Sequence, residues 1–318
     1  MWRAVQGWVF RAIGLNPVSG TGCCSIVIFA ALVRSCFSLS QELALLLLRT
    51  DAVGVNPRRK HQPVADLHAD LLAFVAGDGG RDPYDPRSRA SVDQLALGGV
   101  MVQVLPVYTP GTSGSLDWGQ AQVEVYPEVA EALLQANIET RLAVENASGF
   151  FADDEAFDHG VSRLRDTWDR HGIAYLSMTW AIENRFGGGN ATDIGLKPDG
   201  EFLLGWLVEH EVPVDLSHTS DRLAWDILEF LDREAPGHRV VASHSNFRAV
   251  CEHPRNLPDD LALEVKMRGG VIGLNLCRGF LGTGPESAVE HVQYAMELGV
   301  SEILCLGTDF FSSLDLPE

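Results

Sequence analysis

Several patterns that commonly announce a function are missing from this 318-residue sequence. The six cysteines form no CxxC pair, which argues against a structural zinc knuckle. No GxSxG turn presents a serine nucleophile, and no GxGxxG loop follows a predicted strand. Basic residues are scarce, with 24 Lys and Arg against 43 Asp and Glu. Because nucleic acids and anionic membranes attract basic surfaces, the net charge of -19 argues against both as main partners.

A membrane-spanning run is also lacking in the first 60 residues, which we treat as an N-terminal extension. The apolar run at 23–33 is interrupted by Arg34 and falls short of the roughly 20 residues that span a bilayer. The start Met-Trp-Arg is compatible with a signal or anchor, but no clean cleavage site follows. Residues 1–60 are therefore either disordered or an anchor, with a short helix predicted at 38–49. A cytoplasmic location and membrane anchoring both stay open.

Residues 61–318 alternate between short apolar segments and helical patterns. We predict eight strands, at 64–72, 100–108, 141–147, 174–180, 212–218, 239–245, 270–276 and 303–310. Near-continuous apolar strands are typical of a parallel sheet covered by helices. Helices are predicted at 91–97, 118–136, 153–171, 201–210, 221–233, 258–268 and 285–298. This pattern predicts one α/β domain, a TIM (β/α)8 barrel, with a doubly wound open sheet as the alternative.

The predicted barrel is short at its C-terminal end. Glu318 follows the eighth predicted strand by eight residues, which leaves no room for the helix that normally comes after it. We therefore expect a barrel that lacks its last helix, or one in which residues near 41–49 cover that flank.

Five of the eight predicted strands carry His, Asp or Glu at their carboxyl ends. The first ends in His68 and Asp70, whose spacing of two directs both side chains to one side. The third, fifth, sixth and eighth end in Glu145, His218, His244 and Asp309. Because these ends converge in a TIM barrel, the side chains should meet there. Imidazoles and carboxylates without thiolates suit zinc or a similar divalent ion.

The number of candidate ligands exceeds what one catalytic zinc needs. A carboxylate at Glu145 would suit a bridge between two ions. Two ions about 3.5 Å apart can share a hydroxide and polarise a carbonyl. Asp309 would then be available to move a proton between that hydroxide and a leaving nitrogen. Asp215, near the end of the fifth strand, is expected either to orient a ligand or to cap a loop.

Seven stretches between about residues 64 and 311 carry a resemblance to a known family. They are ADLHADLL, LGGVMVQVLPVYT, YLSMTWAIENRFGGGN, VDLSHTSDRLAWDILE, VVASHSNFRAVCEHPRNLPDD, GGVIGLNL and LGTDF. In these the chain resembles the bacterial-type branch of the membrane (renal) dipeptidase family of zinc metallopeptidases. The resemblance implies a TIM barrel with two zinc ions held by His68, Asp70, Glu145 (bridging), His218 and His244. It also implies that Arg255 binds the substrate carboxylate and that Asp309 handles the proton or the substrate amine.

Two departures from the family pattern concern the substrate. Trp180 stands where many members have a substrate-contacting histidine; its indole N–H can donate a hydrogen bond but cannot titrate. After Asp309 the chain continues Phe-Phe-Ser, whereas members often continue Phe-Asp-Gly.

The sequence thus predicts a zinc-dependent dipeptidase that cleaves a dipeptide or a similar small amide. Two alternatives stay open: another amidohydrolase reaction, on an N-acyl amino acid or a lactam, and a catalytically inactive barrel with a binding role. A homodimer is compatible with the sequence, which gives no direct signal for it.

Overall fold

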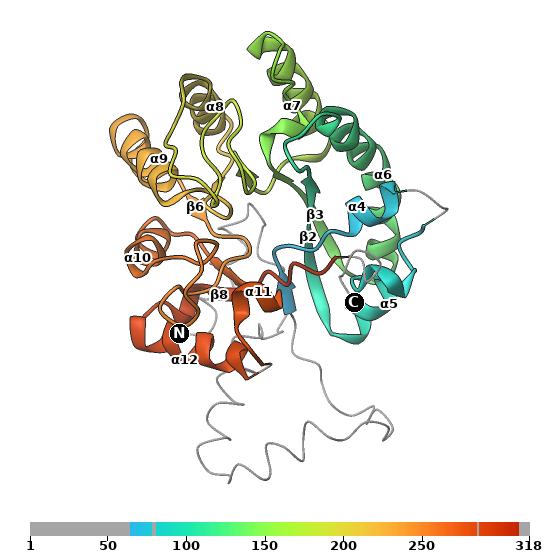
Figure 1. Cartoon of the computed structure of the whole chain (residues 1–318). Helices are drawn as coiled ribbons and strands as arrows, with labels where there is room; N and C mark the ends of the chain where they lie inside the picture. Colours follow the sequence, from blue (N-terminus) through green and yellow to red (C-terminus); the bar gives the residue numbers. More distant parts are fainter. Residues whose placement is uncertain (1–63, 78–80, 285, 312–318) are drawn as a thin grey trace, which may run out of the picture.

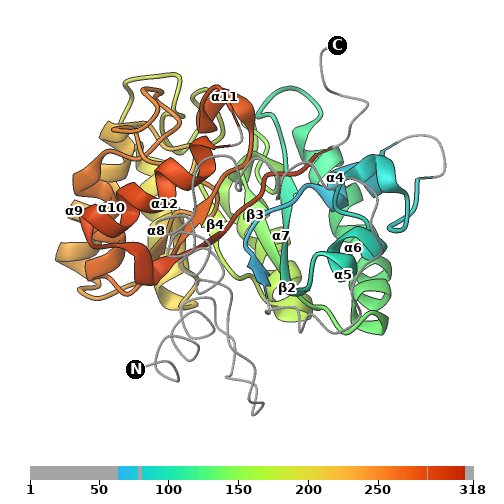
Figure 2. The ribbon, with the colours of Figure 1, turned by 90° about the horizontal axis from the view of Figure 1, so that it is seen from below.

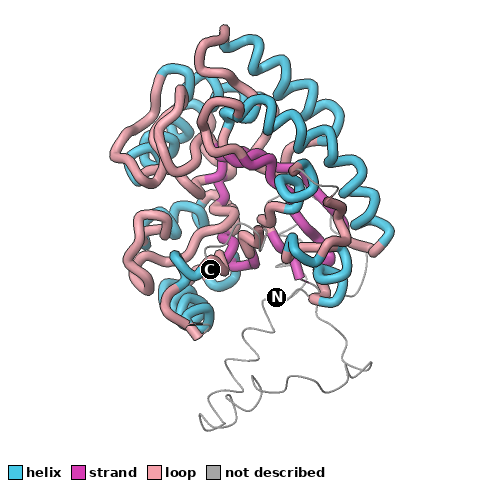
Figure 3. Tube along the Cα trace, turned by 45° about the vertical axis from the view of Figure 1, so that its right-hand side comes forward, coloured by secondary structure: helices cyan, strands magenta, loops and turns pink. Residues whose placement is uncertain are grey.

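Eight parallel strands form the centre of the molecule. The computed structural model describes residues 64–77, 81–284 and 286–311. Within these ranges one sheet has the strand order β6-β5-β4-β3-β2-β1-β8-β7. A bridge between Ala242 and Ile272 links the two end strands, and the Gly273 N–H donates to the Ala242 carbonyl at 2.8 Å. Figure 3 shows the resulting ring of strands inside an outer ring of helices. The prediction of a TIM barrel is confirmed.

Six of the eight strands are shorter than predicted, mostly at their carboxyl ends. The second has the predicted bounds, and the third has the predicted length but lies two residues earlier. They are β1 Val64–Asp66, β2 Val100–Tyr108, β3 Glu139–Glu145, β4 Leu176–Ser177, β5 Val214–Asp215, β6 Val240–Val241, β7 Ile272–Leu274 and β8 Leu304–Leu306. Three of the predicted strands include a residue with positive φ, namely Asn146 at +73°, His218 at +67° and Asp309 at +57°. An extended strand cannot contain that conformation, so pairing ends before them. The first predicted strand also ran too far, because residues 71–76 form a helix.

Helices cover the outer face of the barrel. They are α4 Leu71–Ala76, α5 Val92–Leu97, α6 Ser115–Gln135, α7 Phe157–His171, α8 Pro198–Glu209, α9 Asp221–Glu234, α10 Asp259–Met267, α11 Arg278–Leu281 and α12 Ser287–Leu298, with single 3-10 turns at Pro86–Ser88, Ala147–Gly149 and Ser301–Ile303. Figures 1 and 2 place α8–α10 and α12 on one side and α4–α6 on the other. Local sequence sets the helix starts. For example, Ser220 accepts from the Leu223 N–H, and Ser91 forms a capping box with Gln94.

Two predictions concern residues outside the described ranges. The extension at 1–60, including the helix at 38–49, falls before Val64, and the flank after β8 involves residues beyond 311. Both therefore stay predictions. Among the described residues, none of the helices combines the length and apolar character needed to cross a membrane.

Apolar side chains fill both faces of the sheet. The larger cluster packs the outer strand faces, such as Leu105 and Val107, against the helices. A smaller cluster, with Val104 and Ala143 among its members, lies on the inner face. These two residues precede Tyr108 by four positions and Glu145 by two, so all share one face of their strands. The inner cluster therefore forms an apolar floor beneath the polar residues at the carboxyl ends.

Glycines allow the closest strand contacts beside the predicted ligand His244. A Cβ on Gly273 would lie 1.9 Å from the Ser243 carbonyl oxygen, and a Cβ on Gly307 would lie 2.0 Å from the same atom. No side chain fits at either position without moving the backbone at Ser243, just after β6. These glycines therefore fix the position of the segment that carries His244.

We expect Gly273→Ala to destabilise the fold by about 3 kcal/mol, because the new methyl group meets a backbone carbonyl that cannot turn aside. Gly205, exposed in α8, provides the control because no atom lies within 4 Å of the position that a Cβ would take there. Gly205→Ala should be neutral or stabilise by roughly 0.5–1 kcal/mol. Urea unfolding of both variants measures the difference, and equal midpoints would contradict the packing argument.

Candidate metal centre

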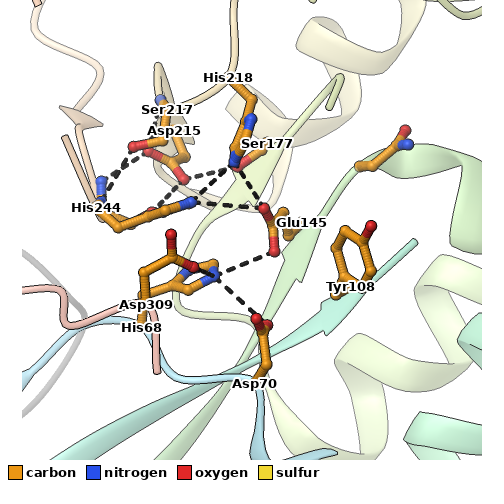
Figure 4. A network of polar contacts seen from close by, with 12 residues as sticks. His68, Asp70, Tyr108, Glu145, Ser177, Asp215, Ser217, His218, His244 and Asp309 are labelled. Carbon is orange, nitrogen blue, oxygen red and sulfur yellow. Dashed lines mark hydrogen bonds and ion pairs between the residues drawn. The ribbon is translucent and has the colours of Figure 1, made fainter. Parts of the chain in front are cut away.

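A row of polar residues crosses the inner face of the barrel. Tyr108, Glu145, Ser177 and Asp215 are successive register partners on β2, β3, β4 and β5. Paired residues of parallel strands point to the same face of a sheet. All four side chains therefore point into the barrel, as Figure 4 shows. Glu145 is buried and lies at the centre of the residues drawn there.

Three histidines direct the same ring nitrogen at Glu145. Its Oε2 lies 3.1 Å from Nε2 of His68. Its Oε1 lies 2.9 Å from Nε2 of His218 and 3.5 Å from Nε2 of His244. These last two nitrogens are themselves 3.0 Å apart. Each oxygen of Glu145 thus faces a different set of imidazoles.

Two further carboxylates complete the centre. Asp70 Oδ1 lies 3.8 Å, and Asp309 Oδ1 3.9 Å, from Nε2 of His68. The structure thus brings together all the residues predicted from the strand ends. Their donor atoms form three groups, each with its members within 4.8 Å of one another: His68, Asp70 and Glu145; Glu145, His218 and His244; and His68, His244 and Asp309. The first two groups share Glu145, so two neighbouring ions could be held with this carboxylate between them.

The outer hydrogen bonds determine which nitrogen of His68 and His218 carries the proton. The Tyr175 hydroxyl donates to the Leu67 carbonyl at 2.8 Å, so it accepts from Nδ1 of His68 at 3.0 Å. Nδ1 of His218 lies 3.1 Å from the amide oxygen of Asn190, which can only accept. Both imidazoles therefore carry a proton on Nδ1. In the neutral tautomer their Nε2 lone pairs face Glu145.

His244 follows the same rule through a serine. The Ser243 hydroxyl donates to Asp215 Oδ2 at 2.5 Å and so accepts from Nδ1 of His244 at 2.7 Å. When all three imidazoles are neutral, as metal ligands must be, three Nε2 lone pairs and the carboxylates converge with no donor between them. Within the described residues, the buried His68 Nε2 and Asp70 Oδ1 have no hydrogen-bond partner. Such acceptors are costly to bury together unless a cation lies among them, so the residues fit a metal centre.

The pKa values follow from the same crowding. Burial acts to lower the pKa of His68, yet the charges of Glu145, Asp70 and Asp309 raise it to about 9. Burial lowers the pKa of His218, and that of His244 further. The latter two imidazoles therefore stay neutral, as metal ligands must be. The high pKa of His68 shows how strongly the carboxylates attract positive charge.

Arg255 and Trp180, the residues predicted to contact substrate, lie beside the centre. Arg255 is buried and donates to the Ser245 hydroxyl at 2.8 Å and to the His244 carbonyl at 2.7 Å. Its Nε has no partner among the described residues. The half-buried Trp180 ring lies 5.9 Å from the ring of His218 and 5.4 Å from that of Tyr108.

Asp309 is held in place from the neighbouring strand. The Asn275 side chain donates to Asp309 Oδ2 at 2.9 Å. The backbone N–H of Asp309 donates to the His68 carbonyl at 3.0 Å. The other carboxylate oxygen points toward His68. One oxygen is thus anchored and the other faces the centre.

Sequence reasoning missed several residues of the site. Tyr108 ends its strand as Glu145 does, and that position was the available signal. Burial and the charges of Glu145, Asp70 and Asp309 raise the pKa of its phenol, which stays a neutral donor. Tyr175 and Asn190 gave no signal, because their contacts depend on the packing of separate segments.

A parallel barrel with histidines and carboxylates gathered at the carboxyl ends of its strands defines a TIM-barrel hydrolase of the metal-dependent type. The sequence model of one family, membrane dipeptidase (peptidase family M19), matches residues 56–318. The chain belongs to this family and is a metallo-dipeptidase.

Individual relatives agree with this assignment. An uncharacterized dipeptidase of Schizosaccharomyces pombe is 27% identical over 333 residues, covering 86% of this chain and 78% of that protein. The dipeptidase aclJ of Aspergillus oryzae is 32% identical over 149 residues, covering 44% of this chain and 34% of its own. A Rhodobacter sphaeroides metallopeptidase, solved with a phosphinate mimic of the dipeptide L-Ala-D-Ala, shares the fold with a TM-score of 0.63 at 19% identity. The structural match covers 78% of this chain and 86% of the Rhodobacter sphaeroides chain.

We expect zinc to raise the melting temperature of metal-free protein by on the order of 10 °C for each ion bound. At a thousand-fold excess over the dissociation constant, each ion adds about 4 kcal/mol, and each kcal/mol shifts melting by roughly 2–4 °C. Calorimetry after dialysis against a chelator, with and without added zinc, measures the shift. Glu145→Gln should lose most of it, and an equal shift in that variant would contradict the shared role of Glu145.

Proposed function

We propose that the chain is a zinc-dependent dipeptidase with two ions per chain. His68, Asp70 and Glu145 would hold one ion, and Glu145, His218 and His244 the other. The observation that carries the proposal is the division of the Glu145 carboxylate, whose two oxygens face different imidazoles at 3.1 Å and 2.9 Å. Nitrogen and oxygen donors without thiolates are the set that suits a catalytic zinc pair. When bound, the ions would polarise the amide carbonyl and activate a water as the nucleophile.

The remaining side chains would hold the substrate and move its proton. Asp309, anchored by Asn275, keeps one oxygen toward the centre and is placed to carry a proton to the departing amine. Arg255 has a free buried Nε–H and a positive charge, which suit the substrate carboxylate. Trp180 and Tyr108, edge to face at 5.4 Å, form an aromatic wall beside His218.

The comparisons support a dipeptide as the substrate class. The Rhodobacter sphaeroides enzyme was solved with a mimic of L-Ala-D-Ala. Because its barrel resembles this one, we include dipeptides with a D-residue in second place among the substrates of this chain.

A substrate panel tests the proposed function. It should hold dipeptides with an L- or D-residue in second place, the same dipeptides with an amidated C-terminus, N-acyl amino acids and a β-lactam. We expect the free dipeptides to be cleaved fastest and amidation to cost roughly ten-fold or more in kcat/KM, because Arg255 would lose its charged partner. Faster cleavage of N-acyl amino acids would reassign the reaction. No hydrolysis by zinc-loaded protein would favour a binding role.

Asp309→Asn tests the proton transfer separately from metal binding. We expect kcat to fall by about 10²–10⁴, because an amide of the same shape cannot carry the proton. The increase in melting temperature with zinc should persist, since the two groups that share Glu145 stay intact. Stopped assays with a dipeptide and calorimetry measure the two effects. A variant that keeps more than a tenth of wild-type kcat would remove Asp309 from this role.

A further inference from the structure

Asp215 is a buried carboxylate surrounded only by neutral donors. Its Oδ1 accepts from the backbone N–H groups of Ser217 at 3.0 Å and Ser243 at 2.9 Å. Its Oδ2 accepts from the hydroxyl groups of Ser177 at 2.6 Å and Ser243 at 2.5 Å. Within the described part of the chain, Asp215 forms no ion pair with Lys, Arg or His. Its charge and that of the buried Arg255 interact without a direct ion pair. A buried carboxylate that lacks a direct ion pair depends on its hydrogen bonds for stabilisation.

The charge matters because an ionised carboxylate can only accept hydrogen bonds. Ser243 has a single hydroxyl proton, which it donates in the hydrogen bond to Asp215. The serine oxygen must then accept from Nδ1 of His244, 2.7 Å away. This fixes the imidazole with its proton on Nδ1 and its lone pair on Nε2, the nitrogen that faces Glu145. The order of donors runs from His244 through Ser243 to Asp215.

We propose that Asp215 is a positioning residue that, through Ser243, holds His244 in the tautomer whose Nε2 can bind a metal ion. The inference rests on the metal centre proposed above. Asp215 lies one register step from Ser177 and two from Glu145, so the same row of the barrel carries both the central carboxylate and the group that orients its neighbour.

Asp215→Asn reverses the order of donors without changing the shape. The amide oxygen must stay at the Oδ1 position, because two backbone N–H groups point there. The amide nitrogen therefore occupies the Oδ2 position and donates to the Ser243 hydroxyl. That hydroxyl then turns its own proton to Nδ1 of His244, which moves the imidazole proton to Nε2. A protonated Nε2 faces Glu145 as a donor and cannot bind metal.

The test combines nitrogen NMR of the full-length, metal-free protein with zinc titration. In wild-type protein at neutral pH we expect the 15N shifts of His244 to report a proton on Nδ1, and in Asp215→Asn a proton on Nε2. Zinc affinity at one of the two sites should fall by about 10–100-fold in the variant. Ser177→Ala is the matched control, since it removes an equally buried hydrogen bond to the same Oδ2 and leaves the path to His244 intact. It should keep the Nδ1 tautomer and bind zinc within about three-fold of wild type.

The outcomes separate this inference from the proposed function. An unchanged His244 tautomer in Asp215→Asn, or equal zinc affinity in that variant and wild type, overturns the role of Asp215. Failure of wild-type protein to bind zinc overturns the metal centre instead, and the tautomer measurement still decides the role of Asp215. If Asp215→Asn does not fold, Ser243→Ala replaces it. That variant should lower zinc affinity at one site by about ten-fold and give a mixture of His244 tautomers, and a pure Nδ1 tautomer would contradict the proposal.

Discussion

The Glu145 carboxylate is the feature on which the rest of the site depends. A charged group buried in a barrel needs positive charge or several donors nearby, because the cost of removing it from water is otherwise too high. Here three imidazoles meet it. Burial acts to raise the pKa of Glu145, yet the charge of His68 beside it helps to hold that pKa well below its usual range. His68, whose pKa is raised, can donate to Glu145 only while protonated on Nε2, the atom that a metal ion would take. The same geometry therefore serves the protein with a proton or with a metal.

Each of the three histidines is oriented by a different hydrogen-bond partner. Tyr175 orients His68, Asn190 orients His218, and Ser243 with Asp215 orients His244. The partners come from different loops and strands, so no single segment determines the centre. Such outer contacts fix the tautomer and the ring plane of a metal-binding imidazole. The barrel supplies the rigidity they require, because its inner apolar cluster and close glycine contacts leave little room for strand movement.

The sequence predicted the parts of this arrangement that depend on single strands. Each strand end that carries His, Asp or Glu could be read from its apolar run, and barrel topology brings those ends together. The boundaries were less predictable: residues 71–76 continue an apolar run yet form α4, since a short run gives no clear period. Tyr175 and Asn190 could not be assigned because their roles depend on contacts more than twenty-five residues away along the chain. The sequence left two alternatives for Asp215, orienting a ligand or capping a loop. Its contacts are compatible with both, since it accepts the Ser217 N–H of its own turn and also the N–H and hydroxyl groups of Ser243 beside His244.

Among the described residues, three of the six non-glycine residues with positive φ lie just beyond the carboxyl ends of strands, at Asn146, His218 and Asp309. His218 and Asp309 both adopt left-handed backbone, which costs a non-glycine residue on the order of 1 kcal/mol or more. A backbone hydrogen bond to another residue of the site holds each of them in this conformation. The His218 carbonyl accepts from the Asn190 N–H at 2.9 Å, and the Asp309 N–H donates to the His68 carbonyl at 3.0 Å. Asn190 thus binds both the backbone and the ring of His218, and His68 fixes the backbone of a carboxylate that faces its own ring. The strained backbone is therefore stabilised by residues of the centre itself. These contacts fix the backbone turn after each strand, and that turn sets the direction of the His218 or Asp309 side chain.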